Sequence, residues 1–405
     1  MINNVPRTKE KNNLFLLLIT FLSIYLPSSF SLSQYTGTER LLMYLAYAVL
    51  MVVYLLLRYG GTLRLPIYCI IPFILILMVS LLNQSSIKSI LIITAYYVTA
   101  ILFVCVVKRE IWIKYYQKVM CILAVFSIIA FVLVVFFPDI IRRLPTTVNG
   151  GQLRAYTMFF AVVPTDLQLR SFGLFWEPGA YQVYLSLAVM FEFFCVEKTN
   201  TKRLFLYIVA LCLTFSTAAY FVLLAIVVAV LFNGLYASKE RKKSIYFLLA
   251  LLIPIIIAYY VIMYFDPSLY YTVFGKLEHF TADSSHSAGI RYSSIEGTIQ
   301  ALWQSPIWGW GQEGLKTFFE NTYNHKMNTF TPGNWFAENG IFYGTVMCIG
   351  LFKFTQAFSK RTFMRFLLFI ILLMMLAAED FASNVSVLIW IMYGLKGEER
   401  KEVLN

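Results

Sequence analysis

Two stretches of the sequence place arginines among aromatic and small residues, in a chain where charge is otherwise scarce. The first is RSFGLFWEPG, in which Arg170 precedes Glu177 by seven residues, and Arg154 lies upstream of it. The second is SAGIRYSSIEGTIQALWQSPIWGWG, which carries Arg291. An arginine side chain presents a planar fork of donors that suits phosphate and carboxylate groups. These arginines therefore predict a site that binds an anion.

Two glutamates are candidates for acid–base chemistry. Glu177 directly precedes Pro178, which suits the first turn of a helix because its missing N–H does no harm there. The positive end of that helix would favour the ionised carboxylate. A helix cap beside interfacial aromatic residues is the simpler interpretation of Glu177, but it leaves Arg170 unexplained. Glu338 lies in NWFAENGIFYG, and an acid at membrane depth is a functional candidate.

The second stretch also predicts a helix followed by a close-packed turn. Arg291 opens an amphipathic segment that ends before Pro306, and Gly309 and Gly311 follow. Glycines permit close approach of the backbone to a ligand. The alternative is a helix that lies in the membrane interface. Its apolar face and its anchors would be Ile295, Ile299, Leu302, Trp303, Trp308 and Trp310.

The elements that must position these residues are membrane helices. The chain is 60% hydrophobic and 13% charged, whereas soluble domains are about 45–50% apolar and about 25% charged. The predicted fold class is an all-α integral membrane protein with about 12 transmembrane helices. The expected segments are 14–30, 41–57, 65–82, 87–107, 119–137, 179–196, 204–216, 218–235, 245–265, 335–354, 363–378 and 381–395.

The basic residues predict the orientation of these segments. Most of the 33 lysines and arginines lie in the termini and in every second short connection, and these all fall on the same side of the membrane. The positive-inside rule then predicts a multi-pass protein of the cytoplasmic (inner) membrane with both termini cytoplasmic. Segments 204–216 and 218–235 are interpreted as two helices that meet at Ser216 and Thr217, because this keeps the block SKERKK inside. A nucleic-acid binder would instead cluster its basic residues on one soluble face, so nucleic acid is excluded.

Two long outer (periplasmic or extracellular) segments, 138–178 and 266–334, interrupt a single polytopic domain of residues 1–405. Loops of this length are usually functional or disordered, and their aromatic composition argues against disorder. We expect them to pack into one anion-binding cavity. The lysines of the second segment are interpreted as solvated surface. The three histidines match no metal-ligand spacing, so no metal site is predicted.

Taken together, R-S-F-G-L-F-W-E-P, the G-I-R helix with S-P-I-W-G-W-G, and N-W-F-A-E-N-G resemble the O-antigen polymerase and ligase family, the Wzy-type enzymes of bacterial surface polysaccharide. The resemblance covers the whole architecture and is sharp at 170–182 and 287–344. The ligase branch carries a histidine shortly before the E-x-G helix. This chain has Asn328 or Thr329 there, with His325 out of register, which favours the polymerase.

The resemblance implies a GT-C-like membrane glycosyltransferase that is inverting and needs neither metal nor cofactor. It would polymerise undecaprenyl-pyrophosphate-linked (polyprenyl) oligosaccharide repeats into O-antigen or capsular polysaccharide at the outer face. Glu177 would take the proton of the attacking hydroxyl, with Glu338 as the second candidate. The residues implied to bind pyrophosphate and glycan are Arg154, Arg170, Arg291, Gly309 and Gly311. Its partners would be lipid-linked donor and acceptor, membrane lipids and a chain-length regulator.

Three alternatives remain at this point. An O-antigen ligase would transfer finished glycan to the lipid A core. A flippase for lipid-linked oligosaccharide would place its arginines inside the helix bundle and have short loops, whereas this chain concentrates them in long outer segments. A structural scaffold would leave the arginines without a purpose.

Overall fold

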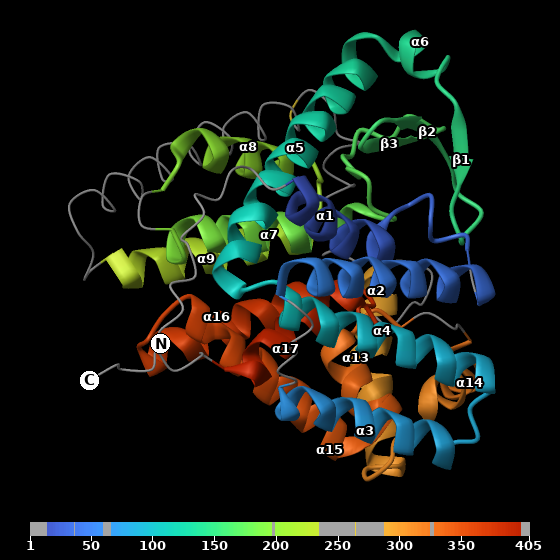
Figure 1. The fold of residues 1–405 in the computed structure, drawn as a ribbon. Coiled ribbons are helices and arrows are strands. Elements are labelled where there is room, and N and C mark those ends of the chain that lie inside the picture. Colours follow the sequence, from blue (N-terminus) through green and yellow to red (C-terminus); the bar gives the residue numbers. More distant parts are fainter. Residues whose placement is uncertain are drawn as a thin grey trace, which may run out of the picture.

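The computed structural model describes residues 14–35, 37–59, 66–196, 199–234, 264, 287–324 and 328–397, and these are mostly helical (Figure 1). The helices of the first half are α1 (Leu14–Ser28), α2 (Thr38–Tyr59), α3 (Ile67–Leu82), α4 (Ile87–Val106), α5 (Arg109–Phe136), α6 (Pro138–Ile141) and α7 (Pro178–Phe194). Those that follow are α8 (Thr201–Cys212), α9 (Thr217–Gly234), α13 (Ser287–Gln304), α14 (Gly311–Tyr323), α15 (Thr331–Phe354), α16 (Thr362–Leu376) and α17 (Val385–Lys396).

A helix coincides with each expected apolar segment except 245–265, of which only residue 264 is among the described residues. Within the described ranges, three helices are long and apolar enough to cross a membrane: Thr38–Leu57, Ile87–Val106 and Arg109–Phe136. Shorter apolar helices are Leu14–Ser28, Ile67–Leu82, Thr217–Asn233, Thr362–Leu376 and Val385–Lys396. These apolar helices support a membrane protein, and the number of spans stays a prediction.

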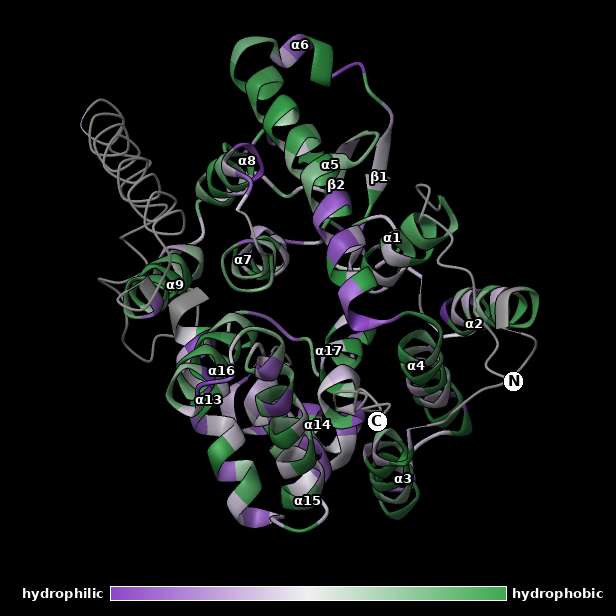
Figure 2. Ribbon diagram, turned by 60° about the vertical axis from the view of Figure 1, so that its left-hand side comes forward, coloured by the Kyte–Doolittle hydropathy of each residue, from purple (hydrophilic) through white to green (hydrophobic). Residues whose placement is uncertain are grey.

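Helix α7 is the centre of one half of the molecule. All of its residues are buried, and it packs against α5, α8, α9 and α16, which surround it in Figure 2. Polar contacts fix it to α5, since Ser127 and Tyr181 share a hydrogen bond of 2.9 Å and Gln117 Nε2 donates to the carbonyl of Ala188 at 3.0 Å. A helix buried on all sides holds its two ends at defined places.

The first outer segment contains a small sheet, which corrects the all-α prediction. Strands β1 (Thr146–Val148), β2 (Arg154–Met158) and β3 (Ala161–Pro164) pair antiparallel in that order. Their residues are largely β-branched or apolar, which favours strands. The Asn149 side chain accepts hydrogen bonds from the amides of Gly151 and Leu153, both at 2.9 Å, and so shapes the first turn.

A turn at residues 213–216 separates helix α8 from helix α9, so the prediction of two helices is confirmed. Phe215 has a positive φ of 45°, and the Tyr220 hydroxyl donates to the carbonyl of Cys212 at 3.0 Å across the turn. The SKERKK block that motivated this prediction lies outside the described residues. This turn matters for function because it contacts the segment that carries Arg170.

Candidate functional site

The RSFGLFWEPG stretch is held on both sides before it enters α7. The amide of Phe30, after α1, donates to the carbonyl of Leu174 at 2.8 Å, and the amide of Val162 in β3 donates to Gly173 at 2.7 Å. Gly173 has a φ of 56°, and a Cβ there would lie 3.0 Å from the Tyr181 ring. Glycine is therefore required at this turn.

Arg170 lies against the turn between α8 and α9. The amide of Ser171 donates to the carbonyl of Leu213 at 2.8 Å, and Arg170 Nε donates to the carbonyl of Thr214 at 3.3 Å. Only one edge of the guanidinium is used by that bond. The partly buried head therefore keeps donors for an anion.

Three charged residues lie near Arg170: Glu177 from the same stretch, Arg291 from α13, and Glu379 from the connection between α16 and α17. Burial lowers the pKa of the Arg170 guanidinium; Glu177 opposes this, the positive charge of Arg291 lowers the pKa further, and Glu379 raises it. These four residues are called the charged cluster below. Three of them, Arg170, Glu177 and Arg291, are predicted site residues, and the structure brings them together.

Glu177 occupies the position before the first residue of α7, where a capping residue would lie. Its backbone is extended, with φ −149° and ψ 155°, and its side chain makes no capping hydrogen bond. The side chain is exposed and interacts with Glu379. The helix cap therefore does not account for Glu177, which leaves an accessible carboxylate at the edge of the cluster.

Glu379 is the member of the cluster that the sequence analysis missed. It lies between α16 and α17 with 7% of its surface exposed. Its carboxylate covers the start of α7 so closely that a Cβ on Gly179 would lie 2.0 Å from Oε1. Burial raises the pKa of Glu379, the charge of Glu177 and a hydrogen bond to it raise it further, and Arg291 lowers it.

The turn that carries Glu379 is tied to the start of α15. The hydroxyl of Thr331 donates to the carbonyl of Glu379 and accepts from the amide of Phe381, each at 2.6 Å. Next to it, Asp380 Oδ1 accepts from the amide of Ala382 at 3.0 Å. The available signal was the acid pair in LAAEDFAS, since acids at membrane depth are functional candidates.

Arg291 comes from α13, whose buried face is polar or small rather than apolar. Ser294, Thr298 and Ala301 are buried, whereas Ile295 and Ile299 are 44% and 51% exposed. The Ser294 hydroxyl accepts from the amide of Thr329 at 3.2 Å, which ties the helix to the chain before α15. The exposed apolar face fits the helix in the membrane interface, and Arg291 still reaches the charged cluster.

Glu338, Gly309 and Gly311 form a different grouping. Among the described residues, the charges that act on Glu338 are Asp380, Lys316 and Glu313, not the arginines of the cluster. A Cβ on Gly309 would lie 2.4 Å from the Glu338 backbone, and one on Gly311 would lie 3.0 Å from Asn83. The two glycines are thus already required by contacts within the protein, and their contact with a ligand stays a prediction.

The loop before α14 is joined to a kink in α15. Gly340 interrupts the helix with φ 79°, and a Cβ there would lie 1.9 Å from the carbonyl oxygen of Ile307. The amide of Ile341 donates instead to Pro306 at 2.8 Å, and that of Trp310 donates to Ala337 at 3.0 Å. This backbone pairing explains the predicted S-P-I-W-G-W-G motif as a docking element.

The remaining predicted residues lie apart or outside the described chain. Arg154 begins β2 and is exposed, and it is not among the charges that act on Arg170. Lys316 pairs with Glu313 at 2.9 Å on the surface of α14. Lys276, Lys326 and the three histidines lie outside the described residues.

Comparison with known proteins bears on part of the chain. Residues 204–346 match the family model described as O-antigen ligase. The matched range includes Arg291, Gly309 and Glu338, whereas Arg170 and Glu379 lie outside it. No curated protein and no solved structure matches this chain. The match supports the O-antigen ligase and polymerase family and a glycosyl-transferring role in polysaccharide synthesis, and it does not separate the two activities.

Proposed function

We propose that this protein is a membrane glycosyltransferase that polymerises polyprenyl-pyrophosphate-linked oligosaccharide repeats at the outer face of the cytoplasmic membrane. The observation that carries the proposal is the charged cluster, Arg170, Arg291, Glu177 and Glu379, at the start of α7. Two arginines and two carboxyl groups supply the functions that the reaction needs. These are binding of the leaving pyrophosphate and removal of a proton from the attacking hydroxyl.

The arginine pair suits the pyrophosphate. Arg291 lowers the pKa of Arg170, so the two positive charges repel each other in the protein alone. A pyrophosphate between them would remove this repulsion and accept hydrogen bonds from both guanidinium forks. Donors that are already in place stabilise the negative charge that develops on a leaving group. In this proposal the arginines stabilise the leaving pyrophosphate, and no metal is required.

The carboxyl pair suits the proton transfer. An acceptor hydroxyl attacks the anomeric carbon, the bond from that carbon to the pyrophosphate oxygen breaks, and the hydroxyl proton passes to Glu177. Glu379 keeps its proton because it is buried next to another acid, and it can donate a hydrogen bond to ionised Glu177. A single displacement of this kind inverts the anomeric configuration. Glu338 is the second candidate for the base.

The second candidate function is the ligase, and the observation that favours it is the family match at 204–346. Both reactions have the same leaving group, so the charged cluster suits either. They differ in the acceptor, which is a second lipid-linked repeat for the polymerase and the lipid A core for the ligase. At the position where the ligase branch carries histidine, Asn328 accepts from the amide of Phe330 at 3.1 Å.

The test is to incubate the purified protein with one synthetic lipid-linked repeat unit. A ladder of products on a gel is expected for the polymerase. Product that appears only after lipid A core is added would identify the ligase. No glycosyl transfer with either acceptor, together with movement of the intact lipid across vesicle membranes, would overturn both proposals in favour of a flippase.

Single variants then test the arginines in the same assay. Arg170→Ala and Arg291→Ala should each abolish product, and Arg291→Lys should also be poor because an ammonium cannot present the bidentate fork. Lys316→Ala is the matched control, since Lys316 is a surface cation paired with Glu313 and lies apart from the cluster. Full activity in both arginine variants would contradict the proposed pyrophosphate site.

A further inference from the structure

A cavity of about 260 Å³ lies at the end of α7 opposite to Glu177. It opens between the start of α5 and the start of α8, with Cys195 and Ala357 on its walls. The basic residues predict that this end of the bundle faces the cytoplasm. The cavity is therefore separate from the charged cluster, and the proposed glycosyl transfer does not use it.

The charged residues that line this cavity are mostly cationic. Among the described residues they are Arg109, Lys114 and Arg203, together with one acid, Glu110. The side chain of Arg109 is only 14% exposed, whereas Glu110, which lies 3.7 Å away, is 75% exposed. The acid therefore retains much of its contact with water, and the arginine is turned inward. A cavity whose charged lining is mostly of one sign attracts ions of the opposite sign, here anions.

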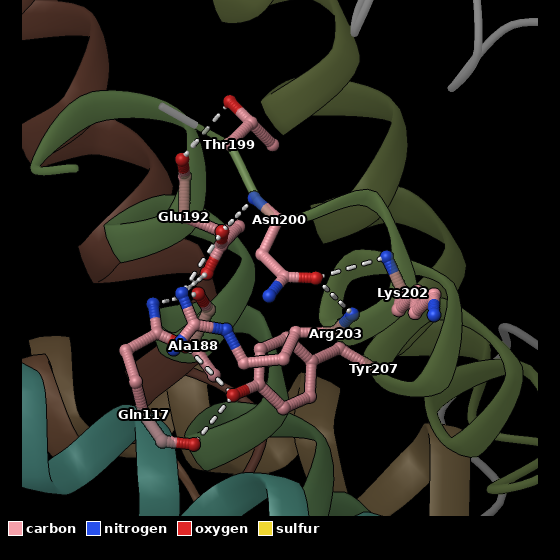
Figure 3. A network of polar contacts seen from close by, with 8 residues as sticks. All are labelled: Gln117, Ala188, Glu192, Thr199, Asn200, Lys202, Arg203 and Tyr207. Carbon is pink, nitrogen blue, oxygen red and sulfur yellow. Dashed lines mark hydrogen bonds and ion pairs between the residues drawn. The ribbon is translucent and has the colours of Figure 1, made fainter. Parts of the chain in front are cut away.

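A polar network fixes one wall of the cavity (Figure 3). Glu192, the fully buried acid of α7, pairs with Arg203 at 3.0 Å and accepts from the amide of Asn200. The Asn200 side chain in turn accepts from the amides of Lys202 and Arg203 at 3.1 Å and 3.2 Å. The Arg203 guanidinium is thus held in one position before any ligand arrives, which lowers the entropic cost of binding.

Two further features show unused capacity at this wall. The Nε of Arg203 is buried, and within the part of the chain that the structure describes it has no hydrogen-bond partner. A buried donor without a partner is costly, so the described residues do not fully satisfy the Arg203 guanidinium. Arg109 is also the first residue of α5, and the start of a helix carries a partial positive charge that attracts anions.

We propose that this cavity binds a phosphate group, with Arg109, Lys114 and Arg203 as its cationic contacts. Arginine forks match tetrahedral phosphate oxygens, and basic pockets between membrane helices on the cytoplasmic side bind phosphate-bearing lipid headgroups. The phosphate can come from an anionic phospholipid of the inner leaflet or from free phosphate in the cytoplasm. The site would tie the inner half of the bundle to an anion, independently of the reaction at the outer end.

The test uses the full-length protein in nanodiscs that contain phosphatidylglycerol and phosphatidylcholine. Native mass spectrometry measures the lipid that stays bound, and titration of delipidated protein with inorganic phosphate measures the free anion. The Arg109→Gln/Lys114→Gln double variant should bind the phosphate-bearing ligand on the order of tenfold more weakly. Lys114→Gln alone, at an exposed side chain, should show a smaller loss, which guards against misfolding of the double variant.

Two matched controls each remove one positive charge at a residue that does not line the cavity. Lys118→Gln removes a lysine one turn further along α5, which packs over the Tyr115 ring at 5.1 Å and does not line the cavity. Lys202→Gln removes the neighbour of Arg203, which does not line it either. Arg203 itself is left intact because its removal would leave Glu192 buried without its ion pair.

Each outcome decides the proposal. Retention of phosphatidylglycerol that is lost in the cavity variants but kept in Lys118→Gln identifies a lipid headgroup as the ligand. Binding of inorganic phosphate with the same dependence, but no selective lipid retention, identifies the free anion. Equal binding of both ligands by the wild type, the cavity variants and the controls overturns the proposed site.

Discussion

The two ends of α7 carry the same residue type in opposite situations. At the inner end, Glu192 is fully buried, pairs with Arg203 at 3.0 Å and accepts from the Asn200 amide. At the outer end, Glu177 is exposed, makes no capping hydrogen bond and interacts with a second acid. One carboxylate is paired with an arginine of its own chain, and the other lies next to a second carboxyl group.

This difference separates a structural acid from a reactive one. A fully buried acid that is ion-paired within the chain is closed to a substrate, and its removal lowers the stability of the protein. An accessible acid beside Arg170 and a second carboxyl group contributes little to folding, and it remains available to a substrate. Helix α7 therefore provides an internal control, because a glutamate can be replaced at either end of the same helix and the two effects can be compared.

The largest expected effect is on the reaction at the outer end. Glu177→Gln should lower the rate of glycosyl transfer on the order of 10²–10⁴-fold, because the amide cannot take a proton. Stability should change by only about 0.3–1 kcal/mol, the scale of a charge at a helix end. Product formation and thermal unfolding of the same preparation measure the two quantities. Glu338→Gln is the comparison, and if it is inactive while Glu177→Gln is active, the two acids exchange roles.

The inner end should respond in the opposite way. Glu192→Ala should destabilise the protein by roughly 3–5 kcal/mol, towards the lower value because Arg203 keeps 27% of its side chain exposed. Unfolding in increasing mole fractions of sodium dodecyl sulfate measures this loss. The control is Glu313→Ala, which removes an equally short but exposed pair with Lys316 and should cost about 0–1 kcal/mol. Equal losses in both variants would remove the distinction between the two pairs.

The dependence of stability on pH tests the partner of Glu177. Because its folded-state pKa is raised by burial and by Glu177, Glu379 keeps its proton in the folded protein at pH values where the unfolded chain has lost it. The resulting stability is full at low pH and is lost as the pH rises through the folded pKa. Glu379→Gln, which stays neutral, should flatten this part of the melting-temperature profile. An unchanged pH slope would show that the two carboxyl groups are not coupled.

The smallest effects concern glycines, where the same distinction between internal contact and ligand contact applies. Gly340→Ala forces a side chain into a positive φ and against the Ile307 carbonyl, so it should destabilise by about 1–2 kcal/mol or more. Gly314→Ala, in α14, meets only Trp310 at 3.5 Å and should stabilise by roughly 0.5–1 kcal/mol. Melting temperatures of the two variants measure the difference, and an equal shift would contradict the backbone pairing at the kink.

The features that could be predicted from sequence are those that depend on nearest neighbours along the chain. Apolar segments became helices, the turn before Thr217 separates α8 from α9, and Gly173 takes the positive φ expected of a tight turn. The meeting of Arg170, Glu177 and Arg291 was also predicted, because arginine in long outer segments has few structural reasons to be there. In each case the structural feature follows from the types of the residues in that segment.

The features that were missed depend on contacts between distant segments. Glu379 joins the cluster because Thr331 holds its turn against the start of α15, and no local pattern reports that bond. The three strands are too short for their alternation to stand out from the apolar chain around them. Gly309 was assigned to a ligand, whereas its nearest neighbour is the backbone at Glu338. Backbone approach of this kind cannot be inferred from a glycine alone.

The spread of the charged cluster along the chain has a consequence for biosynthesis. Arg170 and Glu177 leave the ribosome well before Arg291, and Glu379 emerges only with the connection to α17, the last helix among the described residues. Insertion of the early helices therefore yields half of a site, and a product truncated before α16 lacks the acid that covers the start of α7. In the proposed mechanism, a chain synthesised only as far as α16 lacks part of the charged cluster and would not transfer glycan.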